Sequence, residues 1–558
     1  MNYLQAVKDK EVEFNELTAR MDADKDLLYL KKYILKDLDG RTFPNIINIT
    51  LNDAAVFAAN VLSALGSTSQ QVAVESEDLR LDTAYIEEFQ KAAFNAANTR
   101  LRKQGSPPIN PFFDEQLSIR GRAAARCLFR MEEDILIPDI TLWDTRYVTY
   151  EMGVAGLGWA TNKTKRNKDL IEAEYGFTVN GKTGVVLDVW DKVLNEIWID
   201  NQKVREQENP YGYVPIVFQT VSLGSMLADE DSLSHQGESI FFLIRDLIPE
   251  LNRLVSILQT LNMKTASQAL QYKSKAGARA TPPDYEKITA PGAVTSIDET
   301  GGIIPIPIDD IKRTATLLHQ MIETRVQRGS LSSIDLGTLQ FPLSAVALVE
   351  LGEGRDQVFI PRLQAKALLN QELAEMFTQQ VIQIGGSIEL GVRGHKRTFE
   401  TSKLKGAYET TYKYFVKSPK IDIARYSVAM NAERYLDEDT ILRDILQVED
   451  PDGIKQKRYY DMAAELSPAV MRTRIIKALM EKGGDDTEFE AELMSAEMGM
   501  DVKRVMAGEM PEPEITKGGG AAPVVPLLGK GGQRGGARLS AQKAAELKRT
   551  PIEEIGEE

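Results

Sequence analysis

A long and regular hydrophobic pattern lies between Ser239 and Leu261. Its apolar positions recur at steps of three and four residues and are Ile240, Leu243, Ile244, Leu247, Leu251, Leu254, Val255, Leu258 and Leu261. This spacing places them on one face of a helix. Pro249 lies inside the pattern, and proline removes a backbone donor and crowds the preceding turn. The pattern therefore predicts one long helix over 236–268 that bends at Pro249.

A second apolar stripe follows further along the chain. It consists of Ile311, Ala315, Leu318, Ile322 and Val326. Asp309 and Asp310 favour a helix start before it, and Gly329 favours a helix end after it. The stripe predicts a second helix over 309–329.

The segment 269–308, between these two helices, is rich in proline and glycine. Pro282-Pro283 and Pro291-Gly292 interrupt it, and isoleucine alternates with proline from Ile304 to Ile308. Proline is excluded from helix interiors but is accepted in turns and edge strands. We therefore expect a small module of turns and short strands that joins the two helices at one end.

This order of elements resembles the portal proteins, or head-to-tail connectors, of tailed bacteriophages. The resembling features are Ile248-Pro249-Glu250-Leu251-Asn252-Arg253-Leu254, Pro283-Asp284-Tyr285-Glu286, Pro291-Gly292-Ala293-Val294 and the helix from Asp310. In that family, two stem helices per subunit carry a compact clip between them, and a ring of subunits encloses a DNA tunnel. The resemblance implies stem helices at 236–268 and 309–329 and a clip at 269–308.

The first 235 residues divide into a helical part and a strand-rich part. Helices are predicted over 24–37, from Thr50 or Asn52 to Leu65, over 82–104 and over 115–130. Strands are predicted at 184–190 and 194–199, with a turn at Asp200-Asn201 into a third strand. The resemblance implies that 1–235 forms the wing of a portal subunit.

Four arginines follow one another in the last of these predicted helices. They are Arg120, Arg122, Arg126 and Arg130. A basic run of this kind is usually a solvated or subunit-facing side, and we favour that interpretation over a DNA contact.

Downstream of the second stem helix, 330–341 is nearly uncharged and 342–386 has a helical pattern. Gly352, Gly354 and Pro361 interrupt that pattern. The resemblance implies a tunnel loop followed by a kinked tunnel helix across the wing. An ordinary connector between helices is the alternative for the loop.

The C-terminal third returns to strands and then to helices. Strands are predicted at 388–390, 396–400 and 408–416, so that 387–420 completes the wing sheet. Helices are predicted at 423–435, 439–446, 452–466 and 469–482. The resemblance implies that 421–507 is the helical crown. Residues 508–558 are rich in Gly, Pro and Ala and are expected to be disordered. The predicted fold class is α+β, mainly helical.

Composition and charge narrow the function. The chain has 558 residues and a net charge of −15, which argues against a broad basic surface that grips nucleic acid. Cys127 is the only cysteine, so no intrachain disulfide forms, as suits a reducing cytoplasm or a virion assembled there. The start of the chain has no signal-peptide pattern, and no apolar run approaches the roughly 20 residues of a membrane span. We expect a soluble protein without a membrane partner.

The sequence offers no catalytic, metal or cofactor site. The three histidines, His235, His319 and His395, are distant in sequence from Cys127, and there is no phosphate-binding G-x-x-x-x-G-K-[ST] loop. The glycine-rich stretch Gly153 to Gly158 follows no clear strand and opens no clear helix. No catalytic residue, metal ligand or cofactor is therefore predicted.

A DNA conduit must hold phosphates weakly, because each neutralised phosphate adds to affinity with a salt slope of about −0.9. The candidate channel residues are Arg253, Lys264, Lys312, Arg313, Arg325 and Arg328, with Ser332, Ser333, Thr338 and Gln340 in the tunnel loop. For each cation alone, a solvated face or an intersubunit salt bridge remains the simpler interpretation.

The two stem stripes are wide for a helix pair standing alone, and no third element lies beside them in sequence. Neighbouring copies in a closed ring would cover them. The candidate subunit-packing residues are Leu247, Leu251, Leu254, Leu258, Leu318 and Ile322.

The resemblance implies a portal at one capsid vertex of the virion, through which DNA is packaged, retained and ejected. It implies a ring of twelve subunits assembled in the host bacterial cytoplasm. The implied partners are the terminase large subunit, a head-tail adaptor, the major capsid protein, and double-stranded DNA that passes without sequence specificity. The alternatives are a metal-dependent nucleic-acid enzyme, or another virion component such as an adaptor or scaffold.

Overall fold

The computed structural model describes most of the chain between residues 2 and 507. The described residues are 2–37, 39–78, 80–132, 135–154, 156–223, 229–266, 270–273, 302–305, 311–329, 345–392, 395–415, 426, 429–446, 448, 451–482 and 485–507. The chain divides into two compact units, Met1–Lys457 and Arg458–Glu558. The predicted tunnel loop, most of the clip and the C-terminal tail lie outside the described residues.

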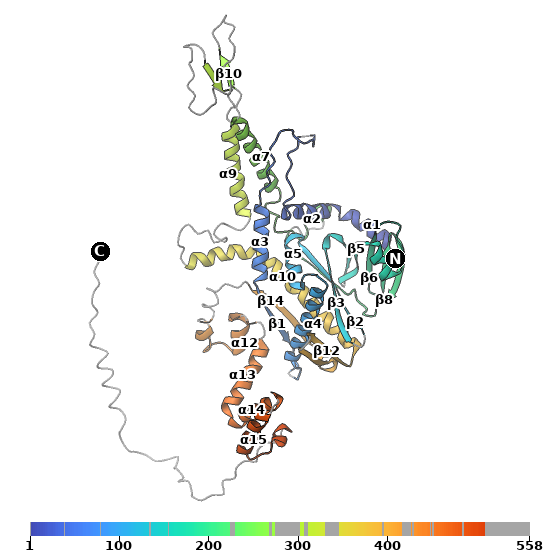
Figure 1. Cartoon of the computed structure of the whole chain (residues 1–558), viewed down its shortest axis with the longest axis vertical. Coiled ribbons are helices and arrows are strands. Elements are labelled where there is room, and N and C mark those ends of the chain that lie inside the picture. Colours follow the sequence, from blue (N-terminus) through green and yellow to red (C-terminus); the bar gives the residue numbers. More distant parts are fainter. Residues whose placement is uncertain are drawn as a thin grey trace, which may run out of the picture. The chain divides into compact units, whose positions relative to one another are not determined.

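The described residues form a mixed α+β fold in which helices predominate (Figure 1). The helices are α1 Tyr3–Glu13, α2 Asn15–Leu28, α3 Asp53–Gly66, α4 Thr83–Lys103, α5 Ile109–Ile119, α6 Lys168–Tyr175, α7 Leu247–Ala266, α9 Ile311–Gly329, α10 Ala345–Ile384, α12 Glu438–Thr440, α13 Pro451–Leu466, α14 Pro468–Lys482, α15 Asp485–Glu497 and α16 Val502–Met506. Short 3₁₀ turns lie at Thr145–Tyr147, Glu230–His235 and Thr401–Leu404, and a π-helical turn lies at Ile441–Ile445.

The strands form two larger sheets and three strand pairs. They are β1 Ser69–Glu75, β2 Arg122–Glu132, β3 Ile135–Trp143, β4 Val148–Gly153, β5 Gly156–Asn167, β6 Thr183–Asp191, β7 Leu194–Ile199, β8 Gln202–Glu208, β9 Ile216–Thr220, β10 Leu270–Lys273, β11 Gly302–Pro305, β12 Ser387–Val392, β13 His395–Glu400 and β14 Glu409–Phe415. One sheet has the order β3-β2-β9 and the other the order β4-β5-β6-β7-β8. The pairs are β1-β14, β10-β11 and β12-β13, and all pairings are antiparallel.

The predicted meander is confirmed. Strands β6, β7 and β8 follow one another in the five-stranded sheet. Asp200 and Asn201, between β7 and β8, have φ of 46° and 69°. Two consecutive residues with positive φ are typical of the tight turn whose twist matches that of a hairpin. The glycine-rich stretch 153–158 contains the turn of the β4-β5 hairpin, so it is not a strand-to-helix loop of a dinucleotide site.

The predicted helix over 115–130 is wrong. Helix α5 ends at Ile119, and β2 begins at Arg122. Alternate residues of β2 face two different cores, with Ala123 and Ala125 in one and Ala124 in the other. Because both faces of this central strand are apolar, the alternation that marks a strand is hidden in the sequence. Likewise, the first predicted helix is α2, which ends at Leu28 rather than extending to residue 37.

The expected bend at Pro249 is also wrong. Helix α7 begins at Leu247, and the preceding residues from Ile240 form turns. Pro249 therefore lies in the first helical turn, where backbone N–H groups have no partner within the helix and proline is accepted. By contrast, α10 continues through Gly352, Gly354 and Pro361. Figure 1 shows the two halves of α10 running in different directions, as expected for a proline inside a helix.

The sequence predicts that the strands in 387–420 complete the meander sheet, but in the structure they do not join it. Strand β14 pairs with β1, joining Phe415 to Ser69 and Glu409 to Glu75. Strands β12 and β13 pair only with each other among the described strands. The main core of the first unit lies where α4, α5 and α10 cover β2 and β3, and its largest side chains include Phe89, Phe113 and Phe377.

The predicted helices at 452–466 and 469–482 are confirmed, whereas 439–446 forms only the short α12 and a π-helical turn, and 433–435 of the helix predicted at 423–435 form a turn. Helices α13 and α14 begin at Pro451 and Pro468, at the first helical position that proline favours. In the second unit, α14, α15 and α16 share a small core around Ile476, Ala491 and Val505.

Candidate assembly surface on the two-helix stem

Helices α7 and α9, together called the stem here, run side by side (Figure 1). At the base of the stem, Ile248 of α7 and Val326 of α9 share a buried cluster with Phe359 of α10. Gly329 ends α9 close to the segment before α7. A Cβ atom at that position would lie 2.8 Å from the side chain of Ile244. The base of the stem is thus packed against the rest of the first unit.

A third element covers one side of α7. The extended segment 47–51 runs antiparallel to the helix and donates three backbone hydrogen bonds to its side chains. The bonds join Ile47 N to Thr260 Oγ1 at 3.0 Å, Ile49 N to Ser256 Oγ at 2.9 Å, and Leu51 N to Asn252 Oδ1 at 2.9 Å. No pattern in the sequence predicts this element.

The repeat of these bonds follows from backbone geometry. Four helical residues rise about 6 Å, and two extended residues rise about 6.6 Å, so every fourth side chain of the helix meets every second N–H of the segment. Ser256 and Thr260 also donate their hydroxyl protons to the carbonyls of Asn252 and Ser256, each at 2.7 Å. The polar stripe is therefore buried with its hydrogen bonds satisfied.

This arrangement changes the interpretation of the α7 stripe. Leu251 is 3% exposed and Leu254 is 6% exposed within a single copy of the chain. Leu247 and Leu258 are half-buried. The third element that the stem lacks nearby in sequence is thus supplied from about 200 residues earlier in the chain, and Leu251 and Leu254 are buried within one copy.

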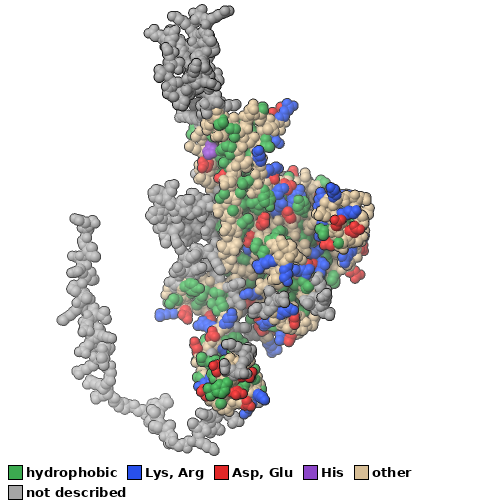
Figure 2. All heavy atoms as spheres, in the orientation of Figure 1, with side chains coloured by type: hydrophobic (Ala, Val, Ile, Leu, Met, Phe, Trp, Pro, Cys, Tyr) green, Lys and Arg blue, Asp and Glu red, His purple; other side chains and the backbone are tan. Residues whose placement is uncertain are grey.

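Helix α9 keeps apolar surface that the described residues do not cover. Leu317, Leu318 and Met321 are 55%, 40% and 64% exposed, whereas Ile322 is half-buried. Positions 317, 318 and 321 lie on one side of the helix because they are separated by one and three residues. Figure 2 shows hydrophobic side chains gathered on the visible face of the stem. We call these three residues the α9 patch.

The candidate channel residues are described only in part. Arg253 is exposed and forms an ion pair with Glu250 at 2.7 Å, and Arg325 is also exposed. Lys264, Lys312, Arg313 and Arg328 lie in α7 or α9, but their side chains are outside the described part of the structure. Ser332, Ser333, Thr338 and Gln340 lie outside the described residues. No shared face can therefore be assigned to the ten.

A cluster of buried charges connects the base of the stem to the rest of the first unit. We call Arg20, Asp24, Glu238 and Arg245 the anchoring cluster. Arg245 binds Asp24 through Nε at 2.6 Å and Nη2 at 3.0 Å, and it binds Glu238 at 2.6 Å. Arg20 donates to the carbonyls of Ser234 and Gly237, at 2.6 and 3.0 Å. The cluster joins α2 to the segment that leads into α7.

Both carboxylates of the anchoring cluster are fully buried, so their charges depend on these arginines. Burial opposes ionisation of Glu238, but the hydrogen bond from Arg245 and the charge of Arg20 outweigh burial and lower the pKa of Glu238. Burial likewise opposes the charge of Arg245, yet the bonds to Asp24 and Glu238 raise the pKa of Arg245. Glu238 and Arg245 are therefore held in their charged forms, whereas burial raises the pKa of Asp24 and lowers the pKa of Arg20 to about 10.

The arginine run has a structural role at this junction. Arg120 binds Asp144 through two nitrogens, both at 3.2 Å, and Arg122 donates to the carbonyl of Gln236 at 2.9 Å. Arg126 pairs with Asp188 at 2.6 Å. The expectation of a solvated or subunit-facing side is thus wrong for these three.

Arg130, the fourth member of the run, is exposed and pairs with Asp139 at 2.7 Å. Near Arg120 and Arg122, Gly121 has φ of 73°, and a Cβ atom there would lie only 1.6 Å from the carbonyl oxygen of Gly237. The two chain segments cross so closely that only glycine fits at Gly121.

Other site chemistry is sparse in the described part of the chain. It contains no group of three or more His, Cys, Asp or Glu side chains placed to hold a metal ion. Cys127 is buried, and burial raises the pKa of its thiol. Among the described helices, none combines the length and apolarity needed to cross a membrane.

Comparison with known proteins gives remote structural likeness. No family model matches the chain, and no curated protein matches it. A solved chain from the neck of an empty GTA particle, computed with C6 symmetry, is 10% identical with a TM-score of 0.40, and the match covers 71% of this chain and 90% of that chain. Chains from the virion of a native gene transfer agent (GTA) particle and from the neck of a native GTA particle, computed with C12 symmetry, are 10% identical with TM-scores of 0.38, over 71% of this chain and 89% of theirs.

Proposed function

We propose that the chain is a portal-type subunit that assembles with copies of itself into a ring around a DNA channel at one capsid vertex. The order of elements supports this proposal. A helix pair carries a strand pair, β10-β11, between its members in sequence, and a 40-residue helix follows the second member. The two helices of the pair pack against each other, as two helices of a portal stem would.

The observation that carries the proposal is the α9 patch. Leu317, Leu318 and Met321 remain exposed on a stem whose other apolar side chains are largely packed within the chain. Contiguous apolar surface on a soluble protein marks a site of association. In a ring, each subunit presents such a patch to a different surface of its neighbour, and the rotation closes the assembly.

The parts of the subunit follow from this role. The wing comprises 1–235 and 387–420, the stem 236–268 and 309–329, and the clip 269–308. The tunnel loop is 330–341, the tunnel helix 342–386, the crown 421–507 and the tail 508–558. Two described candidates, Arg253 and Arg325, are exposed on the stem, where cations would make brief phosphate contacts in a channel. The remaining channel candidates keep that proposed role.

The partners of such a ring are the terminase large subunit during packaging, a head-tail adaptor afterwards, the surrounding major capsid protein, and double-stranded DNA. In this role the chain guides DNA and has no catalytic step of its own. We propose twelve copies per ring in the virion, assembled in the host bacterial cytoplasm.

The α9 patch gives the test. The double variant Leu318→Glu with Met321→Glu places two charges on the patch, whereas Gln320→Glu adds one charge at an exposed polar position of the same helix. We expect the purified wild type and Gln320→Glu to form rings, and the double variant to remain monomeric with an unchanged circular dichroism spectrum. Size-exclusion chromatography with light scattering measures this. Rings of normal size from the double variant would refute the role of the patch.

A further inference from the structure

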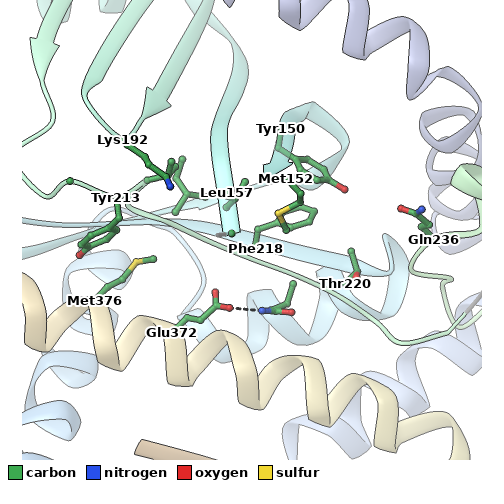
Figure 3. A pocket seen from close by; sticks show the side chains of 15 residues that line it. Tyr150, Met152, Leu157, Lys192, Tyr213, Phe218, Thr220, Gln236, Glu372 and Met376 are labelled. Carbon is green, nitrogen blue, oxygen red and sulfur yellow. Dashed lines mark hydrogen bonds between the residues drawn. The ribbon is translucent and has the colours of Figure 1, made fainter. Parts of the chain in front are cut away.

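A cavity of about 540 Å³ lies beside strand β9 (Figure 3). Its lining comes from the β4-β5 hairpin, the segment that leads into and includes β9, and helix α10, with Lys192 from the β6-β7 turn and Gln236 from the segment before α7. Tyr150, Met152 and Phe218 line one side, and Glu372 and Met376 of α10 line another. We call it the β9 cavity. Its walls combine aromatic, thioether and aliphatic side chains with polar ones, and they contain one carboxyl group, Glu372, and one amino group, Lys192.

Strand β9 is an edge strand. It pairs with β2 on one side, and no other described strand pairs with it. The carboxyl group of Glu372 accepts a hydrogen bond from the side-chain amide of Gln219, and this bond is drawn in Figure 3. Val221 N donates to the carbonyl of Gly121, and Cys127 N donates to the carbonyl of Pro215. The odd-numbered residues next to and within β9 therefore bond to β2, and the N–H of Phe218 points away from β2.

Glu372 has no cationic partner in the described part of the chain. Lys192 is the other charged side chain of the lining, and Figure 3 places it near Leu157, on the opposite side of the cavity. Burial raises the pKa of Glu372 to about 7, despite the hydrogen bond from Gln219. Glu372 is half-buried, and a half-buried carboxylate without a cation would be stabilised by a cation brought into the cavity.

We propose that the β9 cavity is a docking site for an extended segment of a partner protein, which adds as a strand to the edge of β9 and places a lysine or arginine against Glu372. Addition of a strand supplies backbone hydrogen bonds, and pockets for alternate side chains supply selectivity. The aliphatic part of a lysine or arginine would pack on Met152, Met376 and Tyr150, while its charged end reaches the carboxylate.

Charge complementarity favours a basic segment as the occupant. The chain carries a net charge of −15, which attracts basic segments at long range, and Glu372 provides the local partner at the end of the path. The proposal stands apart from ring formation, because the residues of the β9 cavity do not belong to α7 or α9.

The test uses the full chain with ¹³C-labelled methionine methyl groups, because Met152 and Met376 both line the cavity. The probes are the peptide amide acetyl-Thr-Val-Lys-Val-Thr and the same peptide with norleucine in place of lysine. We expect the lysine peptide to shift both methyl resonances, with saturation in roughly the millimolar range. The norleucine peptide should bind about tenfold more weakly, because it lacks the charge-assisted bond.

Glu372→Gln keeps the shape of the side chain and removes its charge, so it should bring the affinity for the lysine peptide down to that for norleucine. Glu375→Gln is the matched control, since Glu375 is an exposed carboxylate one turn along the same helix that acts on Glu372 only through its charge. The Glu375→Gln variant should bind the lysine peptide much more tightly than Glu372→Gln does. Equal affinities of the two peptides, or of wild type and Glu372→Gln, would overturn the proposal. The proposal would also be overturned if neither peptide shifts the methyl resonances of Met152 and Met376. This outcome includes the case in which a neighbouring copy already fills the cavity.

Discussion

The two stem helices have similar apolar stripes in the sequence but different surroundings in the structure. Helix α7 has a second stripe, of Asn252, Ser256 and Thr260, which binds the extended segment 47–51, and its Leu251 and Leu254 are buried. Helix α9 has no comparable cover among the described residues, and Leu318 remains 40% exposed. A helical stripe therefore predicts that a side is buried, but not whether the chain itself or a second copy buries it.

The largest expected loss of stability comes from the anchoring cluster, whose buried charges join α2 to the segment that leads into α7. Asp24→Ala leaves Arg245 with Glu238 alone, and an incompletely paired buried charge costs about 3–5 kcal/mol. We expect a decrease of that size in the free energy of unfolding of the first unit, measured by urea denaturation. Arg253→Ala removes a surface ion pair on α7 and should cost less than about 1 kcal/mol. Equal effects of the two substitutions would contradict the anchoring role.

The next effect compares one leucine from each helix directly. Leu254→Ala removes a buried side chain and should cost about 2–5 kcal/mol, because a cavity remains in a packed site. Leu318→Ala removes an exposed side chain from a single copy and should change the stability of the isolated subunit by about 0.5 kcal/mol or less. Denaturation of dilute, monomeric samples separates the two. A large loss for Leu318→Ala there would mean that α9 is covered within the chain.

The smallest effect tests the segment that covers α7. Asn252→Ala removes the acceptor for the Leu51 N–H and should cost about 1–2 kcal/mol. Hydrogen exchange should show faster exchange at the amides of Ile49 and Leu51, since the segment then separates more often from the helix. Unchanged exchange at both amides would show that other contacts hold the segment in place.

Much of the fold could be predicted where the pattern is local. The meander with its Asp200-Asn201 turn, the helix starts at Pro451 and Pro468, and helix α9 all follow from short-range signals. The strand at Arg122–Glu132 could not be predicted, because its two apolar faces conceal the two-residue period. Pro249 was placed in the interior of a helix because the apolar spacing continues through turns before Leu247.

The candidate site was less accessible from the sequence. The four-residue spacing of Asn252, Ser256 and Thr260 is a visible signal for a polar stripe, but its partner lies about 200 residues earlier in the chain. Nothing in the sequence marks Glu372 as a candidate site residue, because it is one of many carboxylates. Only the folded structure places it beside the edge of β9. Pairings over such separations depend on tertiary structure, which periodicity does not encode.

Single-particle electron microscopy of the purified full chain tests the central claim most directly. The account predicts rings with a central opening, in which the α9 patch of each subunit contacts its neighbour. Monomers at high protein concentration, with Leu317, Leu318 and Met321 facing solvent, would contradict it.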